Sequence, residues 1–466
     1  MKSGTYFPGV NFFLRQLFGT DGIRGVAGEP PLDPKTAHAL GYALGTWACH
    51  IQGKKNHSPE TPEVVIGMDT RESGQWLAEQ VAGGLARAGV NARFAGVITT
   101  PGVAYLTRTG PFVAGVMISA SHNPYLDNGL KVISHSGYKL PDQVEIELEL
   151  LITEWLARND EPIPKTLVAD PALDHLYTNY LAGTVSGSLP MHVTIDCANG
   201  SATQVAPHLF ERLGCKVDWL GISPDSRNIN LDCGSLHLHQ LQKRVLETRA
   251  DLGIAFDGDA DRALFVSGSG RIVDGDAVLF LAGSALKSAG KLKGDVVVAT
   301  VMSNLGLEKA LNLRGIEMLR TPVGDKYVLE EMLKRGAVLG GEQSGHVIFS
   351  EYATTGDGIL TALRILEIVR DSGKSLDDLV DEIHTFPQKL VNVRVKHKRP
   401  LSELQSVQAE IEAAELEFGG SGRVVVRFSG TEPLARVMIE AGSDEQVDKW
   451  TGRIADAIRA ELGAAG

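Results

Sequence analysis

Short apolar runs alternate with longer stretches of helical periodicity along most of this chain. The run Glu63–Met68 is typical of a buried strand. The stretch Trp76–Ala88 that follows places Leu77, Val81 and Leu85 on one face of a helix. Strands that alternate with helices in this way predict α/β layers built on largely parallel sheets.

The same order of strand and polar loop returns further along the chain. Strands are predicted at Phe112–Ile118, Met191–Asp196, Ala250–Phe256, Asp295–Val301 and Ala337–Leu339. Each of them leads into a polar loop, and in open α/β sheets ligand sites form beyond the carboxyl ends of the strands. We therefore expect the chemistry of this protein in these loops.

The last part of the chain has a different pattern. Strands are expected at Lys389–Lys396, Gly422–Phe428 and Ala435–Ala441, and helices at Glu403–Leu416 and Asp444–Leu462. This order describes an α+β module. With connectors near 175, 275 and 388, the sequence predicts three related α/β domains (1–175, 176–275 and 276–388) and a C-terminal α+β domain (389–466).

Composition narrows the class of protein. The 466 residues carry a formal charge of -12, which argues against nonspecific binding to nucleic acid or to an anionic membrane. The four cysteines match neither a zinc site nor a disulfide framework, so we expect reduced thiols. No run reaches the roughly 18 apolar residues of a membrane span, and the N-terminal stretch lacks the layout of a signal peptide. We expect a cytoplasmic protein.

An acidic loop follows the strand that ends at Phe256. Asp257, Asp259 and Asp261 alternate, so an extended chain would point all three carboxylates to one side, where they repel one another unless a cation neutralises them. A calcium EF-hand is excluded, because Arg262 stands where glycine is needed and Gly268 where glutamate is needed. A solvated acidic turn remains the alternative. Oxygen ligands beside an arginine that can hold phosphate favour Mg²⁺.

A serine loop, Ser119–Pro124, follows another predicted strand. Taken alone it could be a simple turn, since serine and Asn-Pro are turn residues. Beside a metal loop, Ser121 becomes a candidate nucleophile for phosphoryl transfer. Lys131 is a candidate general acid or base if burial lowers its pKa, and a surface lysine is the alternative.

The loop Gly341–His346 places Glu342, Ser344 and His346 at alternating positions. An acceptor, a hydroxyl and a titratable ring on one side would suit sugar hydroxyls and proton transfer. A buried histidine with a satisfied hydrogen bond is the alternative.

A phosphate cradle is predicted at the end of another strand. The residues concerned are Arg427, Ser429, Gly430 and Thr431, which offer a guanidinium, hydroxyls and backbone amides. Arg436 could add a second guanidinium. The loop at Thr321–Asp325, with Thr321 and Gly324, is a further strand-end loop of lower specificity, for which an ordinary turn is the alternative.

These loops, together with Phe18–Gly25, resemble the α-D-phosphohexomutase family in their order along the chain. The resemblance implies four domains around a central active-site cleft, and a phosphoryl group carried on Ser121. It implies one Mg²⁺ per chain, bound by the Ser121 phosphate and the carboxylates of Asp257, Asp259 and Asp261. Arg24, Lys131 and Arg262 would assist transfer, His346 would move a proton, and a trace of sugar 1,6-bisphosphate would prime the enzyme.

Within the family, the start Phe18–Gly25, Gln343 and Thr354–Gly358 are similar to the branch that acts on glucosamine phosphates. This implies interconversion of glucosamine 6-phosphate and glucosamine 1-phosphate, with a small phosphosugar as the partner. The stretch Val132–His135 departs from the aromatic-rich sequence expected there. A mutase for mannose or glucose phosphates, an aspartyl-phosphate enzyme using Asp257 and a non-catalytic sugar-phosphate sensor remain alternatives, and the sequence leaves the oligomeric state open.

Overall fold

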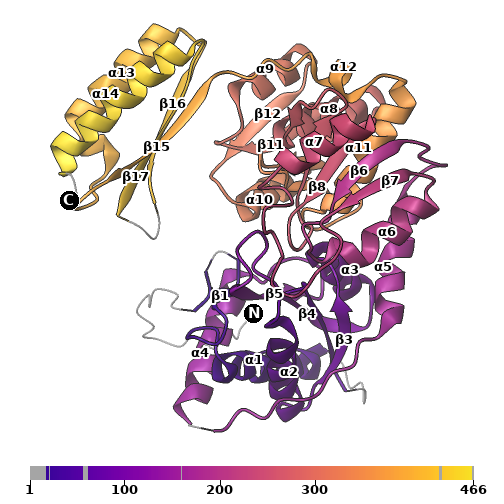
Figure 1. Cartoon of the computed structure of the whole chain (residues 1–466). Helices are drawn as coiled ribbons and strands as arrows, with labels where there is room; N and C mark the ends of the chain where they lie inside the picture. The colour runs from indigo at the N-terminus through magenta and orange to yellow at the C-terminus, as the bar shows by residue number, and fades with distance from the viewer. Residues whose placement is uncertain (1–16, 20, 56–60, 159, 430–432, 464–466) are drawn as a thin grey trace, which may run out of the picture. The chain divides into compact units, whose positions relative to one another are not determined.

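The computed structural model describes residues 17–19, 21–55, 61–158, 160–429 and 433–463. The chain divides into two compact units. The first consists of Met1–Ile272 and His346–Leu376, and the second of Val273–Gly345 and Asp377–Gly466. In both units helices flank β-sheets (Figure 1).

The first sheet of the first unit has the order β1-β5-β4-β2-β3. Its strands are β1 (Ile23–Val26), β2 (Glu63–Met68), β3 (Asn91–Val97), β4 (Phe112–Ile118) and β5 (Asp127–Ser134). β2 runs parallel to β3 and β4, whereas β5 runs antiparallel to β4 and β1. The accompanying helices are α1 (Pro34–Lys55), α2 (Gly74–Arg87), α3 (Thr100–Thr109) and α4 (Asp142–Ala157).

Both faces of this sheet are buried, as β2 illustrates. Val64 and Ile66 belong to a core that includes Leu77 of α2. Val65 points to the opposite face, because successive side chains of a strand alternate, and it packs in a second core with Val103 of α3. A strand buried on both faces reads as a continuous apolar run, which is why this strand is visible in the sequence.

The second sheet has the order β10-β9-β8-β6-β7. Its strands are β6 (His192–Asp196), β7 (Lys216–Leu220), β8 (Leu252–Phe256), β9 (Ala263–Ser267) and β10 (Ile272–Val273). β6 runs parallel to β7 and β8, and β9 runs antiparallel to β8. The first unit also contains α5 (Pro171–Thr184), α6 (Ala202–Arg212), α7 (His239–Thr248), β14 (Val347–Phe349) and α11 (Gly358–Ser372). α11 packs against β8 and β9, so the chain returns to the first unit after residue 345.

The second unit begins with another α/β layer. β11 (Val296–Thr300) runs parallel to β12 (Glu317–Thr321) and to β13 (Leu339–Gly341). Its helices are α8 (Gly275–Ser288), η1 (Lys293–Asp295), α9 (Leu305–Leu313), α10 (Asp325–Arg335) and α12 (Leu376–Val380).

The C-terminal part of this unit is an antiparallel sheet with the order β15-β17-β16. Its elements are β15 (Gln388–Arg394), η2 (Leu401–Glu403), α13 (Gln405–Phe418), β16 (Arg423–Phe428), β17 (Leu434–Glu440) and α14 (Asp444–Leu462). Val437 of β17, Phe418 of α13 and Trp450 of α14 share one core, so the two helices cover one face of the sheet.

The predicted fold class, α/β domains followed by an α+β domain, is confirmed. The strand predicted at 337–339 exists but begins two residues later, as β13, because residues 336–338 lead out of α10. Gly336, at φ 67°, ends that helix, and the Ala337 N–H donates to the Met332 carbonyl. The helix predicted from Glu403 begins at Gln405, because Leu401–Glu403 forms a 3₁₀ turn.

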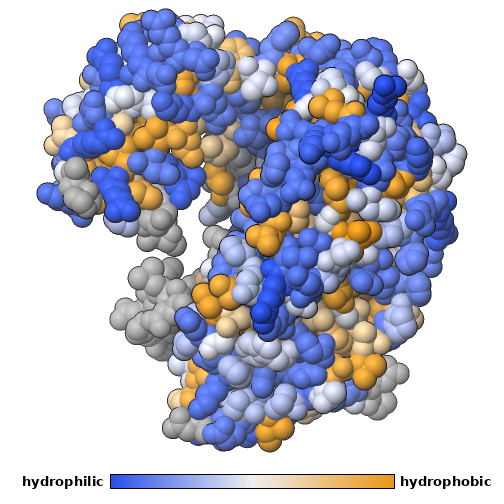
Figure 2. Space-filling model, in the orientation of Figure 1, coloured by the Kyte–Doolittle hydropathy of each residue, from blue (hydrophilic) through white to orange (hydrophobic). Residues whose placement is uncertain are grey.

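Among the described residues, no helix is long and apolar enough to cross a membrane. The face drawn in Figure 2 is mainly hydrophilic, with apolar residues in scattered groups.

Candidate active site

Loops from the first two sheets meet within the first unit. The Thr70 hydroxyl, in the loop after β2, donates to the Asn199 carbonyl after β6 at 2.5 Å. The Thr100 N–H, after β3, donates to the Asp259 carbonyl after β8 at 3.0 Å. The carboxyl ends of strands in two different sheets therefore share one region, and the predicted serine and acidic loops both lie there.

The serine loop delivers a buried hydroxyl to the acidic loop. Ser121 is 2% exposed, and its Oγ donates to Asp257 Oδ2 at 2.5 Å. Its φ of 51° lies in the left-handed region, which is uncommon for a residue other than glycine. His122 lies beside it, with Nδ1 3.2 Å from the Ser121 Oγ, and burial together with Arg262 lowers the pKa of that imidazole.

The acidic loop gathers three carboxylates. Asp257, Asp259 and Asp261 each offer an oxygen atom within 4.8 Å of the others. The expected extended chain is wrong: the loop is a turn, in which Ala260 has φ 53° and its N–H donates to the Asp257 carbonyl at 3.1 Å. The carboxylates converge because the backbone folds back.

The donor set of this loop fits a hard divalent cation. Asp259 Oδ1 and Asp261 Oδ1 are buried and have no hydrogen-bond partner in the described part of the chain. Burial raises the pKa of Asp257, and the charges of Asp261 and Asp259 raise it further. A cation would relieve this repulsion and would take up the two oxygen atoms.

Positive charges approach the acidic loop from the first sheet. Lys131 Nζ, on β5, lies 2.7 Å from Asp259 Oδ2 and 3.2 Å from Asp21 Oδ2. Arg24, on the neighbouring β1, also pairs with Asp21. The condition for an acid or base role of Lys131, a pKa lowered by burial, is not met: burial lowers the pKa of Lys131, but Asp21, Asp259 and Asp261 raise it well above its ordinary value overall. Lys131 is therefore a charged donor.

His346 approaches Asp261 from the segment that returns to the first unit. Its Nε2 accepts the Gly356 N–H at 3.0 Å, which leaves the proton of a neutral ring on Nδ1, 3.5 Å from Asp261 Oδ2. Burial alone would raise the pKa of Asp261, but His346, Lys131 and Arg262 hold it well below its usual range. The backbone N–H of Arg262 also donates to Asp257 Oδ1 at 3.2 Å.

The remaining predicted residues lie in the second unit. Glu342 Oε1 accepts the Gly324 N–H at 3.1 Å, so the loops that contain Glu342, Ser344, Thr321 and Gly324 are connected. The Gly341–His346 loop turns instead of extending, because the Gly345 N–H donates to the Glu342 carbonyl at 3.0 Å. Ser344 is exposed and Thr321 is buried.

Two arginines face each other in the C-terminal sheet of the second unit. Arg427 on β16 is paired with Arg436 on β17. Like charges directly opposite one another destabilise a sheet, and burial together with Arg436 lowers the pKa of Arg427. An anion would offset this repulsion. Ser429 is the first residue after β16, and its backbone N–H donates to the Leu434 carbonyl at 2.9 Å. Gly430 and Thr431 lie outside the described residues.

Several polar residues of the first unit were missed by the sequence analysis. Asp21 forms an ion pair with Lys131. The Thr100 hydroxyl donates to Asp259 Oδ2 at 2.5 Å. Asp69 and Arg71 lie next to the serine loop. Asp69 and Arg71 directly follow β2, at the same edge of the sheet as Ser121. The rule that sites form beyond strand ends applies to them equally, and only the absence of a recognisable motif hid them.

Comparison with known proteins agrees with this picture. Models of phosphoglucomutase/phosphomannomutase domains I, II, III and the C-terminal domain match residues 15–158, 173–270, 274–386 and 390–457. The chain is 59% identical over 450 residues to a phosphoglucosamine mutase of Solibacter usitatus, a match that covers 96% of this chain and 99% of the relative. It is 52% identical to one of Koribacter versatilis, covering 98% and 99%.

Among solved structures, a phosphoglucomutase/phosphomannomutase family protein from Burkholderia thailandensis matches with a TM-score of 0.79 and 25% identity, covering 96% of this chain and 98% of that one. The predicted phosphohexomutase resemblance is thereby confirmed. This chain belongs to the phosphoglucomutase/phosphomannomutase family.

Proposed function

We propose that this protein is an isomerase that interconverts glucosamine 6-phosphate and glucosamine 1-phosphate through a phosphoserine. The single observation that carries the proposal is the buried Ser121 hydroxyl, 2.5 Å from Asp257 in a cluster of three carboxylates. Relatives 59% and 52% identical to the chain, both phosphoglucosamine mutases, support the choice of the amino sugar.

The proposed reaction has two transfers. In the first, the bond between the Ser121 Oγ and phosphorus breaks, the free sugar oxygen takes the phosphoryl group, and the proton lost by that sugar hydroxyl ends on the Ser121 Oγ. The sugar 1,6-bisphosphate then turns and returns its other phosphoryl group to Ser121. The serine proton passes to the sugar oxygen that is released, so atoms and charge balance. A trace of the same bisphosphate would prime an unphosphorylated chain.

The residues of the first unit suit this chemistry. Asp257, Asp259, Asp261 and the phosphate on Ser121 would hold Mg²⁺, which supplies charge stabilisation to phosphoryl transfer. Lys131 stays protonated, so with Arg24 and Arg262 it can offset the charge of the phosphoryl oxygens. His346 is the candidate proton carrier, with its proton held at Nδ1.

We assign substrate recognition to the residues of the second unit. Glu342 and Ser344 would bind sugar hydroxyls, with Thr321 and Gly324 in the connected loop. The distal phosphate would be held by Arg427, Ser429, Gly430, Thr431 and Arg436. The repulsion between the paired arginines supports this assignment, because a phosphate between them would remove it. We also infer a cytoplasmic location and a domain division at about 175, 275 and 388.

The test compares kcat/KM for glucosamine 6-phosphate with kcat/KM for mannose and glucose phosphates, in Mg²⁺ with a trace of sugar 1,6-bisphosphate. We expect a preference of at least about tenfold for the amino sugar, since its 2-ammonium group makes charge-assisted hydrogen bonds that the 2-hydroxyl of glucose or mannose cannot make. Equal or reversed preference would move the substrate to mannose or glucose phosphate. Loss of turnover on all of them would favour a sugar-phosphate sensor.

A second measurement locates the phosphoryl group. Peptide mass mapping of the protein after incubation with sugar bisphosphate is expected to place it on Ser121. A phosphoryl group on Asp257, with Ser121 unmodified, would instead support the aspartyl-phosphate mechanism.

A further inference from the structure

A buried arginine lies behind the serine loop. Arg71, in the loop after β2, is 2% exposed, and all five N–H groups of its guanidinium donate hydrogen bonds. Nε donates to Asp69 Oδ2 at 2.8 Å. The other four N–H groups donate to four backbone carbonyls of the serine loop and of the start of β5, those of Ser121, Asn123, Pro124 and Asp127.

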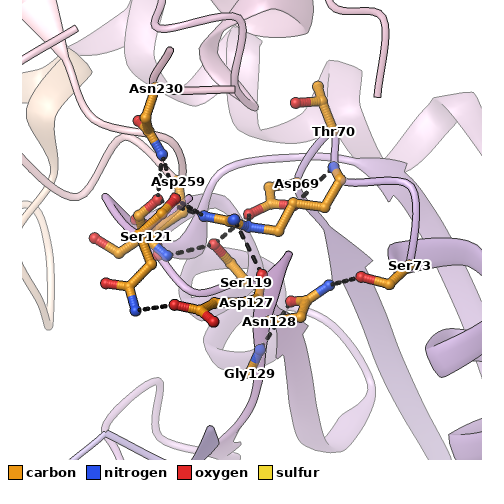
Figure 3. A network of polar contacts seen from close by, with 12 residues as sticks. Asp69, Thr70, Ser73, Ser119, Ser121, Asp127, Asn128, Gly129, Asn230 and Asp259 are labelled. Atoms are coloured by element: carbon orange, nitrogen blue, oxygen red, sulfur yellow. Dashed lines mark hydrogen bonds and ion pairs between the residues drawn. The ribbon is translucent and has the colours of Figure 1, made fainter. Parts of the chain in front are cut away.

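Arg71 is also connected to the backbone N–H of Ser121, through a chain of hydrogen bonds that includes Asp69 and Ser119. Asp69 Oδ2 also accepts the Ser119 hydroxyl at 2.6 Å, and Ser119 Oγ in turn accepts the Ser121 N–H at 2.9 Å. Figure 3 shows Asp69, Ser119 and Ser121 joined in this way. Ser119 is fully buried, and its hydroxyl is committed to this chain of hydrogen bonds.

Both the N–H and the carbonyl of the Ser121 backbone are therefore held by hydrogen bonds with side chains. Its N–H donates to Ser119 Oγ, and its carbonyl accepts a hydrogen bond from Arg71 Nη2 at 2.9 Å. The same carbonyl accepts a second hydrogen bond from Asn230 Nδ2, also at 2.9 Å (Figure 3). Such an arrangement is needed because the left-handed φ of Ser121 persists only when the surroundings determine it several times over. This backbone conformation aims the Oγ at Asp257.

We propose that Arg71 is a positioning residue for phosphoryl transfer, which with Asp69 and Ser119 holds the backbone of Ser121 so that its Oγ meets the acidic loop. This inference rests on the function proposed above. Arg71 touches neither the Ser121 Oγ nor the three carboxylates of the acidic loop in any hydrogen bond of the described structure, so it acts through the loop.

The substitution Arg71→Lys keeps the charge and the partner Asp69 but offers three donors in place of a planar fork of five. We expect kcat to fall by about 10²-fold, because a misplacement of the order of 1 Å at reacting atoms costs that much, while KM for glucosamine 6-phosphate stays close to wild type. The rate of Ser121 phosphorylation by sugar 1,6-bisphosphate, measured in a single turnover, should fall by the same factor.

The matched control is Arg227→Lys. Arg227 forms an ion pair with Glu72, the residue that follows Arg71 in the sequence. Unlike Arg71, Arg227 lies on the surface, and its side chain is 64% exposed. We expect wild-type kcat and KM for this control. Ser119→Ala is the second test variant: it removes the partner of the Ser121 N–H and one hydrogen bond to Asp69, but it leaves the buried pair of Asp69 and Arg71 in place, and it should lower kcat by about tenfold.

The outcomes separate the two proposals. A wild-type protein that neither turns over nor takes up phosphate defeats the proposed function itself. An active wild type with a folded Arg71→Lys of unchanged kcat, or with only KM raised, overturns the positioning role. Should Arg71→Lys fail to fold, Ser119→Ala decides: unchanged phosphorylation and turnover there would overturn the inference.

Discussion

The serine and acidic loops approach each other closely at Gly258, between two of the aspartates. A Cβ at this position would lie 2.5 Å from the Ser121 carbonyl oxygen, 2.9 Å from Ile229 Cδ1 and 3.0 Å from Asn230 Nδ2. The first contact is with backbone, which cannot rotate away. Gly258→Ala therefore probes how closely the two loops must approach each other.

The size of the effect follows from these distances. Ordinary contacts of a Cβ begin at 3.4 Å, so the loops must separate by roughly 0.9 Å to accept the methyl group. The Ser121 Oγ, now 2.5 Å from Asp257 Oδ2, would move out of hydrogen-bonding range. A misplacement of that size is expected to lower kcat/KM by about 10²-fold, and overpacking to lower the free energy of unfolding by about 1–3 kcal/mol.

The assay is the steady-state rate with glucosamine 6-phosphate, alongside thermal unfolding. Gly183→Ala is the matched control: Gly183 is an exposed helical residue of α5 and a Cβ there meets no atom within 4 Å. That substitution should leave activity unchanged and stabilise the protein by about 0.5–1 kcal/mol. A folded Gly258→Ala with wild-type kcat/KM would refute the argument that close approach of these loops sets the rate.

Ser121→Ala removes the proposed nucleophile and should lower kcat by at least about 10³-fold and abolish phosphate uptake in mass spectrometry; undiminished uptake would mean that another residue carries the group. Asp259→Asn removes one charge from the candidate metal site, so the Mg²⁺ concentration for half-maximal activity should rise at least about tenfold, whereas the surface control Asp160→Asn should leave it unchanged. An unaltered titration of Asp259→Asn would exclude it as a ligand. His38 is buried against Trp155, and burial together with a neighbouring arginine lowers the pKa of its imidazole from 6.5. Below that pH the unfolded chain binds a proton that the folded chain does not. The free energy of unfolding of the wild type should therefore fall as the pH decreases, by up to about 1.4 kcal/mol per pH unit more than that of His38→Phe. Parallel unfolding curves for the two proteins between about pH 5 and about pH 7 would contradict this.

Much of the fold could be predicted from the sequence, because buried strands and helices have recognisable patterns of apolar residues. β2 and β4 are covered on both faces, and their continuous apolar runs mark their bounds. The type of site could be predicted from three aspartates in one loop. The geometry could not, since the carboxylates meet through a turn at Ala260 that the alternation of residues does not reveal.

Properties that depend on tertiary neighbours could not be predicted. The pKa of Lys131 is raised because Asp21, more than a hundred residues earlier in the chain, lies 3.2 Å away on the neighbouring edge of the sheet. Arg71 and Ser121 are separated by 50 residues in sequence, and the hydrogen bonds between them exist only in the folded chain. Sequence spacing therefore indicates which groups are present, but the charges and contacts of each group are set by the fold.

The arrangement of the first unit also explains why its site depends on more than the acidic loop. Asp257 accepts the Ser121 hydroxyl, from the loop after β4, whereas Asp259 accepts the Thr100 hydroxyl after β3 and the Lys131 ammonium from β5. The two carboxylates are thus held by different strands of the first sheet, although both belong to one turn of the second. The position of each carboxylate therefore depends on a contact with the first sheet as well as on its own turn. The precision of the site consequently depends on hydrogen bonds between loops, and Arg71, with its five donors, contributes more of these to the serine loop than any other side chain of the described structure.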